Sequence, residues 1–231
     1  MRMLELISDP EVLGIIGLTL RLTLASTLIS TMIGIPAGLL LERLKLPGFL
    51  NWLKRLIVRI NRSLMGTPPV VAGLVIYVLF RRAGPFGGLG LLFSFEAMVL
   101  VQVVLITPII CGMVHTSATR HGDRIRGFAR TMGAGRLQTH ALTMKELSNE
   151  MFFAVITGFG RAMSEVGAII MVGGNIRFLT RTMTTAIALD VRRGFFDEAM
   201  ALGLILMLIA FAIQLLADFL RRRERRSDEN F

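Results

Sequence analysis

The chain has 231 residues and a formal net charge of +10; 53% of its residues are hydrophobic and 18% are charged. This composition, with a mean hydropathy of +0.65, excludes an ordinary soluble domain and predicts a protein that lies mostly in a membrane. Nucleic-acid binding is not indicated, because the basic residues do not run along an exposed helix with interleaved aromatic side chains.

Five apolar segments come close to the roughly 20 residues that a membrane-spanning helix needs. The first covers residues 12–41, and the sequence Ser8-Asp9-Pro10-Glu11 before it is typical of a helix start. No small-residue cleavage site follows a short apolar core, so we expect this helix to remain as a span. The other four segments cover residues 63–80, 97–114, 151–176 and 199–217. The predicted fold class is an all-α integral membrane protein with five transmembrane helices, and residues 1–231 form one domain.

Basic residues and prolines mark the approach to the second span. Residues 42–62 combine leucines and isoleucines with Trp52 and several cations, which is typical of an amphipathic stretch at the inner interface. Pro68 and Pro69 free backbone carbonyls within the span, and a bilayer tolerates this only where protein or water satisfies them. We therefore expect a buried kink, which is either a static packing bend or part of a central cavity.

The longest predicted loop, residues 115–149, separates the third and fourth spans. It predicts two short helices, about 119–132 and 136–147, that meet at Gly133-Ala134-Gly135, where glycine can take a left-handed conformation. Small residues at this corner allow another protein to approach, and the arginines around it can reach carboxylates or carbonyls. The alternative is a solvated basic loop that needs no partner.

The fourth span carries two ionisable residues in an otherwise apolar helix. Arg161 and Glu165 are four residues apart, with Ser164 beside them, so we expect both charges on one helical face. They either gate or line a path, or form a packed ion pair. The packed pair is favoured, because a carboxylate gives an anion path no obvious advantage.

Beyond the fourth span, Gly173-Gly174-Asn175 predicts the end of the helix, and residues 180–190 predict a short helix. Arg181, Thr182, Thr184 and Thr185 give this helix a hydroxyl-rich edge that suits an oxyanion or the face of a binding protein. Ordinary helix capping by the threonines is the alternative.

The distribution of cations predicts the orientation of the chain. Segments 42–55, 115–149 and 221–231 carry fifteen lysines and arginines, whereas the opposite side carries seven. The positive-inside rule then places the N-terminus outside the cell and the C-terminus in the cytoplasm. The basic tail at 221–226 is expected to act as a topological anchor that also contacts membrane lipid.

Several stretches resemble the permeases of ABC importers. Ala129-x-x-x-Gly133 resembles the coupling segment of that family, although Gly127 and Phe128 replace its Glu and first Ala. The stretches Met65–Tyr77 and Arg81–Gly90 are similar to tungstate and molybdate permeases. The run Gly158-Phe-Gly-Arg-Ala-Met-Ser-Glu-Val-Gly167, followed by 171–176 and 181–187, resembles tungstate permeases.

This resemblance implies a homodimeric permease with the type I ABC-importer fold in the cell inner membrane. Two ATPase subunits would bind ATP and magnesium on the cytoplasmic side, and an oxyanion-binding protein would dock outside. The chain itself would have no catalytic residues, metal or cofactor, and it contains no phosphate-binding Gly-x-x-x-x-Gly-Lys-Ser/Thr loop. Tungstate is the expected cargo, with molybdate, sulfate or vanadate as alternatives; a self-contained channel or secondary transporter is an alternative of another class.

The resemblance and the residue patterns described above together give three groups of candidate residues. The groups are an ATPase-coupling set of Arg126, Ala129, Arg130, Gly133, Ala134 and Arg136, a pathway or gate set of Pro68, Pro69, Arg161, Ser164, Glu165 and Asn175, and a binding-protein set of Arg181, Thr182, Thr184 and Thr185.

Overall fold

The structure is a computed structural model that describes residues 9–44 and 47–228. Within these ranges the regular secondary structure is entirely helical. In chain order the elements are α2 (Pro10–Arg43), η1 (Gly48–Leu50), α3 (Asn51–Met65), α4 (Pro69–Phe80), η2 (Gly87–Leu89), α5 (Phe95–Thr131), α6 (Arg136–Glu146), α7 (Ser148–Met163), α8 (Gly167–Gly173), α9 (Met183–Arg193) and α10 (Phe196–Asp228).

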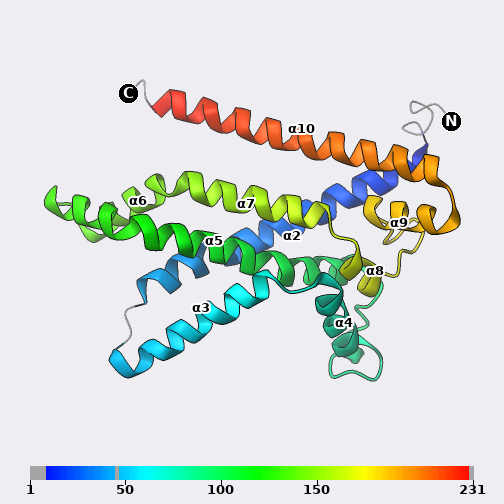
Figure 1. The fold of residues 1–231 in the computed structure, drawn as a ribbon, viewed down its shortest axis with the longest axis horizontal. Coiled ribbons are helices and arrows are strands. Elements are labelled where there is room, and N and C mark those ends of the chain that lie inside the picture. The colour runs from blue at the N-terminus through cyan, green and yellow to red at the C-terminus, as the bar shows by residue number, and fades with distance from the viewer. Residues whose placement is uncertain (1–8, 45–46, 229–231) are drawn as a thin grey trace.

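The long helices α2, α5, α7 and α10 run along the long axis of the molecule (Figure 1). The turn between α5 and α6, residues 132–135, is called the elbow below. It lies at the same end of this axis as the last turns of α10, and we call this the elbow end. The start of α2 lies with α9 at the opposite end, which we call the N-terminal end. The start of the first span and the finish of the last one therefore lie at opposite ends, as an odd number of spans requires.

Three helices in the described part of the chain are long and apolar enough to cross a membrane alone: α2, α5 and residues Phe196–Phe219 of α10. Two further spans are possible if bent pairs are counted, because α3 and α4 meet at 104° and α7 and α8 meet at 60°. The kink expected at Pro68 and Pro69 is present, although Pro68 is exposed and so the kink is not buried within the chain. The prediction of one continuous helix over 151–176 is wrong. The segments 63–80 and 151–176 are thus both broken in their course.

The first break follows from proline chemistry. Pro68 is the N-cap of α4 and Pro69 is its first residue, so neither can donate the backbone hydrogen bond that would continue α3. The second break lies at residues 164–166 and contains no proline. There the Glu165 carboxylate accepts a hydrogen bond from the Ala168 backbone N–H at 3.0 Å, which satisfies a free donor in the first turn of α8.

The beginning of α2 agrees with the sequence. Asp9 is the N-cap and accepts a hydrogen bond from the Glu11 N–H at 2.8 Å, and Pro10 is the first helical residue. By contrast, the predicted separate helix at 119–132 is wrong, because α5 continues without a break from Phe95 to Thr131. The short outer helix exists, although it begins at Met183 and ends at Arg193.

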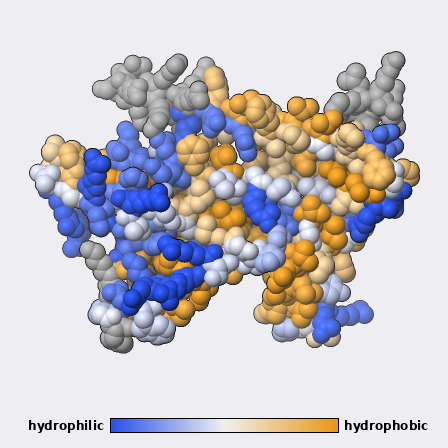
Figure 2. All heavy atoms as spheres, in the orientation of Figure 1, coloured by the Kyte–Doolittle hydropathy of each residue, from blue (hydrophilic) through white to orange (hydrophobic). Residues whose placement is uncertain are grey.

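Helix α5 lies at the centre of the packing and contacts α2 and α7. Close approach to α2 depends on two glycines, since a Cβ on Gly34 would lie 3.0 Å from Ile110 Cβ and one on Gly38 would lie 2.7 Å from the Cys111 carbonyl oxygen. Small residues four apart allow this close approach of two membrane helices. Figure 2 shows that hydrophilic residues gather most densely toward the elbow end, while hydrophobic residues dominate the middle of the visible face.

Candidate functional site

The predicted elbow between α5 and α6 is present. Gly133 has a φ of +73°, and the turn is closed by hydrogen bonds from the Gly133 N–H to the Arg130 carbonyl at 3.0 Å and from the Ala134 N–H to the Ala129 carbonyl at 2.9 Å. This conformation favours glycine, since other residues clash with their own backbone in the left-handed region. A Cβ on Gly133 would meet no atom within 4 Å. The corner is therefore open on its outer side.

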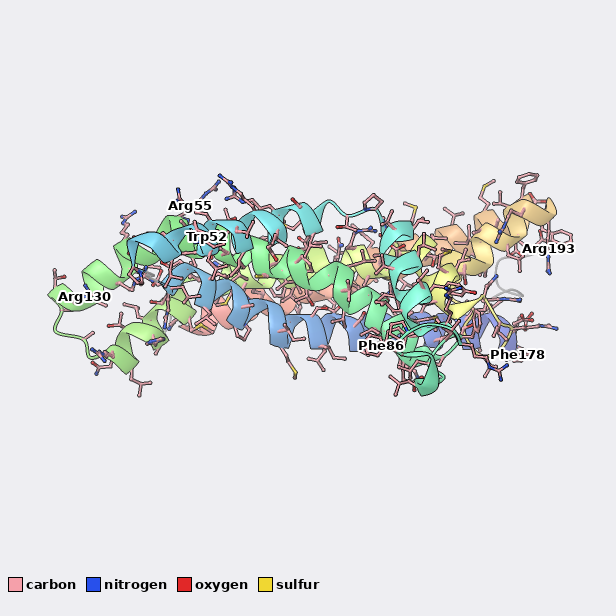
Figure 3. The ribbon with its side chains drawn as sticks, turned by 90° about the horizontal axis from the view of Figure 1, so that it is seen from below. Trp52, Arg55, Phe86, Arg130, Phe178 and Arg193 are labelled. Atoms are coloured by element: carbon pink, nitrogen blue, oxygen red, sulfur yellow. The ribbon has the colours of Figure 1, made fainter. Side chains whose placement is uncertain are left out.

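The six predicted coupling residues gather around this elbow. Ala129 is buried and packs the corner. The remaining residues line or border one cavity of about 420 Å³, whose lining includes Glu42, Arg43, Arg126, Arg130, Ala134, Arg136, Thr139 and His140. Arg130 and Arg136 are exposed. Figure 3 shows Arg130 at the end of the molecule opposite to Phe178 and Arg193.

Arg126 differs from the other elbow arginines because it is held inside the protein. Its guanidinium donates hydrogen bonds to the Glu42 carboxylate at 3.0 and 2.5 Å and to Asp123 at 2.9 Å. Only 10% of the Glu42 side chain is exposed. Because Glu42 is on the last turn of α2, this bidentate pair joins the first span to the part of α5 that leads into the elbow.

The pathway residues fall into two places. Arg161 and Glu165 do form an ion pair, with 3.0 Å between Nη1 and Oε2. However, the expectation that they share one continuous helix is wrong, because α7 ends at Met163 between them. Ser164 is exposed and its hydroxyl donates to the Arg161 carbonyl. The geometry matches the packed ion pair and adds a capping role for Glu165.

The two helix breaks lie against each other. A Cβ on Gly73 of α4 would lie 2.8 Å from the Ala168 Cα of α8, and one on Gly167 would lie 2.6 Å from Val70 Cγ2. Pro68 and Pro69 therefore begin a helix that packs directly on the helix begun by Glu165. The two breaks thus bring two short helices, α4 and α8, into direct contact.

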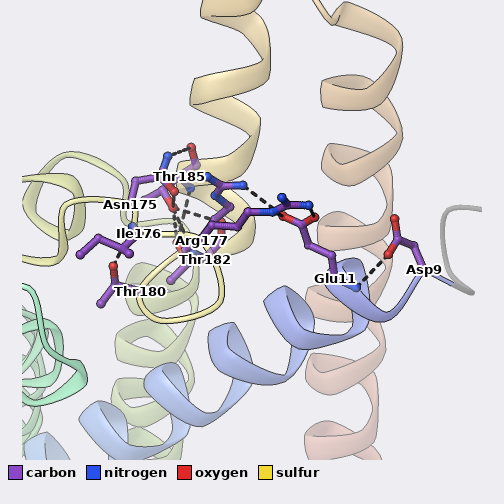
Figure 4. Close-up of polar contacts among 9 residues, drawn as sticks. Asp9, Glu11, Asn175, Ile176, Arg177, Thr180, Thr182 and Thr185 are labelled. Atoms are coloured by element: carbon purple, nitrogen blue, oxygen red, sulfur yellow. Dashed lines mark hydrogen bonds and ion pairs between the residues drawn. The ribbon is translucent and has the colours of Figure 1, made fainter.

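Asn175 lies away from these breaks, at the far end of α8. It has a φ of +51°, and its side-chain oxygen accepts a hydrogen bond from the Thr185 hydroxyl at 2.9 Å. Figure 4 shows this contact beside Thr182 and Thr180. Asn175 thus fastens α9 to the end of the fourth span.

The threonines at the start of α9 are used inside the chain. Thr182, Thr184 and Thr185 are buried, with relative exposures of 1%, 6% and 0%. Thr182 and Thr185 form a capping box, and the Thr184 hydroxyl donates to the Glu165 carbonyl at 2.8 Å. The capping alternative therefore describes these hydroxyls, and the predicted exposed edge is not present.

Arg181 belongs to an ionic cluster with Glu11 and Arg177; Glu11 and Arg177 are labelled in Figure 4. Its Nη1 lies 3.1 Å from the Glu11 carboxylate, which also accepts a hydrogen bond from Arg177 Nε at 2.9 Å. Nearby on α9, burial raises the pKa of the Asp190 carboxyl even though Arg181 and Arg193 lie close enough to lower it. The cluster joins the start of α2 to the loop before α9.

Two contacts were not anticipated from the sequence. Gln102 of α5 is 1% exposed; its oxygen accepts from the Ser26 hydroxyl at 2.5 Å and its nitrogen donates to the Ala162 carbonyl at 2.9 Å. It therefore links three spans. A glutamine within an apolar span is the signal that could have found it. The Glu42 and Arg126 pair carried no comparable signal, since its members are 84 residues apart.

The amino-acid sequence of the chain is similar to those of known permeases. The chain is 40% identical over 206 residues to the tungstate uptake system permease protein TupB of Peptoclostridium acidaminophilum, covering 89% of this chain and 88% of that protein. It is 34% identical over 170 residues to TupB of Campylobacter jejuni, covering 74% and 71%. It is 31% identical over 158 residues to the molybdenum transport system permease protein ModB of Azotobacter vinelandii, covering 63% and 70%.

A family match covers most of the chain. Residues 34–226 match the family described as binding-protein-dependent transport system inner membrane component. The expected type I ABC-importer permease fold is confirmed by this match and by the all-helical architecture. Such permease subunits are not themselves catalytic, and they work with an ATPase and a substrate-binding partner. The chain belongs to the binding-protein-dependent transport system inner membrane component family and is a multi-pass permease subunit of an ABC importer.

Proposed function

We propose that this permease imports a tetrahedral oxyanion, with tungstate as its preferred cargo. The observation that carries the proposal is the 40% identity to a tungstate uptake permease over 89% of the chain. Molybdate is the next candidate, because a molybdenum permease is 31% identical over 158 residues. Sulfate and vanadate remain in the test as further tetrahedral anions.

The proposed orientation has the N-terminus outside and both the elbow and the C-terminus in the cytoplasm. Fifteen cations lie in the segments assigned to the inner side and seven in those assigned to the outer side, which supports this direction. The arrangement in Figure 1 is compatible with it, since the elbow and the last turns of α10 share one end of the long axis.

The elbow is the proposed docking site for the ATPase. Its corner has open space around Gly133, where another backbone can approach. The guanidinium groups of Arg130 and Arg136 have no hydrogen-bond or ion-pair partner among the residues that the structure describes, so both are available for carboxylates or helix C-termini. Two ATPase copies would dock on a homodimer of this chain and would hold the ATP and magnesium.

Movement of the elbow would reach the membrane through two connections. The third span and the segment that leads into the elbow are one continuous helix, α5. The Glu42 and Arg126 pair joins that segment to the first span. The paired breaks at Pro68–Pro69 and Ser164–Val166 would then be the hinges of the gate. The binding protein would dock at the N-terminal end, around the loop that carries Arg177 and Arg181.

The test is reconstitution of the purified permease with its ATPase in proteoliposomes. Binding protein loaded with tungstate, molybdate or sulfate is supplied outside, and both ATP hydrolysis and anion uptake are measured. We expect ATP-dependent uptake, with tungstate giving the highest rate. Uptake by the permease alone, driven by an ion gradient and indifferent to ATP, would instead identify a secondary transporter or channel.

A further inference from the structure

Arg21 is a charged residue on the side of α2 that faces away from the rest of the chain. It is exposed, whereas the adjacent Leu22 is only 1% exposed and faces α5. The exposed residues that follow on the same face are apolar: Leu24, Leu28 and Met32. An ionised arginine among apolar side chains of a membrane span is costly unless a partner or water compensates its charge. Arg21 therefore needs an anionic or aqueous environment.

The described part of the chain supplies no partner for Arg21. No acceptor lies within hydrogen-bond or ion-pair distance of its guanidinium. What lies beside it is a cavity of about 340 Å³ between the first turns of α2 and the loop before α9. Its lining includes Glu11, Gly14, Gly17, Arg21, Phe178 and Arg181.

One wall of this cavity is bare backbone. A Cβ on Gly14 or on Gly17 would meet no atom within 4 Å. Two helical glycines three residues apart thus leave open space beside a cation, so the cavity can admit a group of considerable size. Its volume lies within the range of about 300–1,000 Å³ that is usual for small-molecule sites.

The opposite wall carries a second guanidinium with unused capacity. Arg181 Nη1 is bonded to Glu11, but the Nε of Arg181 is buried and has no hydrogen-bond partner among the described residues. Glu11 is occupied by Arg177 as well as Arg181, so its charge is already compensated. Asp9 and Asp190 line a neighbouring cavity together with Arg177 and Arg181, so carboxylates surround these two arginines, whereas Arg21 has no ion-pair partner among the described residues.

We propose that this cavity binds a tetrahedral oxyanion between Arg21 and Arg181, with Glu11 and Arg177 holding Arg181 in place. A tetrahedral oxyanion has four acceptor oxygens, which suit the unpartnered guanidinium of Arg21 and the N–H groups of Arg181 that Glu11 does not use. Two sources share this chemistry. One is the imported anion on its way from the binding protein, an assignment that rests on the proposed function. The other is the phosphate of a lipid headgroup in the same leaflet.

The experiment measures thermal stability of the permease and ATPase complex in nanodiscs. Sodium tungstate is titrated in phosphatidylcholine nanodiscs, and phosphatidylglycerol is introduced in a second series without tungstate. The variants are Arg21→Gln and Gly17→Leu, whose Cβ enters open space and whose larger side chain fills the cavity. Arg192→Gln is the matched control, because Arg192 is an exposed arginine at the same end that does not line the cavity.

For the imported anion, tungstate raises the melting temperature of the wild type and of Arg192→Gln. Arg21→Gln and Gly17→Leu then need at least tenfold more tungstate for the same shift. For a lipid phosphate, only the phosphatidylglycerol series shows the shift, and it is again lost in both cavity variants. If both cavity variants respond like the wild type in both series, or if the wild type responds in neither, the site is refuted.

Failure of this site and failure of the proposed function have different signatures. If the wild type imports tungstate with ATP but the cavity variants bind and import it equally well, the proposed function stands and the site does not. If the wild type imports no oxyanion while phosphatidylglycerol stabilises it through Arg21, the site stands as a lipid site and the transport proposal fails.

Discussion

Replacement of Gly133 by aspartate tests the elbow as a docking surface. Gly133 has a φ of +73°, and a Cβ added to it would have no atom within 4 Å, so the substitution meets backbone strain but no steric clash. The strain costs about 1–2 kcal/mol, which is small against the roughly 5–15 kcal/mol that stabilises a typical domain. Insertion and dimerisation should therefore survive.

Docking should not survive, for two physical reasons. The new side chain occupies the open corner that the partner backbone would approach, and its carboxylate neutralises the cations at Arg130 and Arg136. We expect ATPase binding to weaken at least tenfold, which corresponds to about 1.4 kcal/mol.

The assay is binding of purified ATPase to the permease in nanodiscs, with melting temperature measured on the same sample. Gly88→Asp is the control, because it adds the same charge at an open glycine outside the elbow. Unchanged ATPase binding by a folded Gly133→Asp variant would show that the elbow is not the docking site.

Three further predictions concern the links between helices. Gln102→Leu should lower the free energy of unfolding by about 1–2 kcal/mol, because Ser26 and the Ala162 carbonyl lose their common partner; a thermal melt in detergent identical to that of the wild type would contradict this. Gly73→Ala should cost about 1–3 kcal/mol, because its Cβ would lie 2.8 Å from the backbone of Ala168, whereas Gly203→Ala, in open space, should melt no lower than the wild type. Glu42→Gln should reduce uptake per ATP hydrolysed more than it reduces ATPase binding, and the exchange of Glu42→Arg with Arg126→Glu should restore part of the ratio; equal uptake per ATP in Glu42→Gln would argue against transmission through this pair.

Much of the architecture was predictable, because the length of an apolar segment and the residues at a helix start or a turn can be read from neighbouring positions in the sequence. The capping side chain of Asp9 and the left-handed Gly133 mark a helix start and a corner in any tertiary context. Five apolar segments were found in the right order, which agrees with three single spans and two bent pairs.

The breaks within spans were harder to predict, for physical reasons that differ between them. Pro68 and Pro69 signalled a kink, but the 104° angle depends on how α4 packs on α8. At Glu165 no residue type requires a helix to end. There the end depends on a carboxylate that caps α8 and on a hydroxyl from Thr184, 19 residues further along the chain.

The candidate site shows the same limit. The elbow residues are close in sequence, so a motif could locate them. The partners of Arg126 and Arg181 are Glu42 and Glu11, which are 84 and 170 residues away. Such pairings follow from the packing of spans, and a single sequence contains no record of them. The exposed threonine edge failed for a related reason, since burial of α9 depends on its contact with α10 and α2.

The sidedness of the elbow tests the central claim most directly. Met132, which is 73% exposed at the elbow, and Phe178, which is 74% exposed at the N-terminal end, are each replaced by cysteine. The native Cys111 is buried, and it is replaced by serine to leave one thiol in each variant. A maleimide that cannot cross membranes should label Phe178→Cys in intact cells and label Met132→Cys only after the membrane is opened. Labelling of Met132→Cys in intact cells would put the elbow outside, where no ATPase could reach it, and would contradict the account.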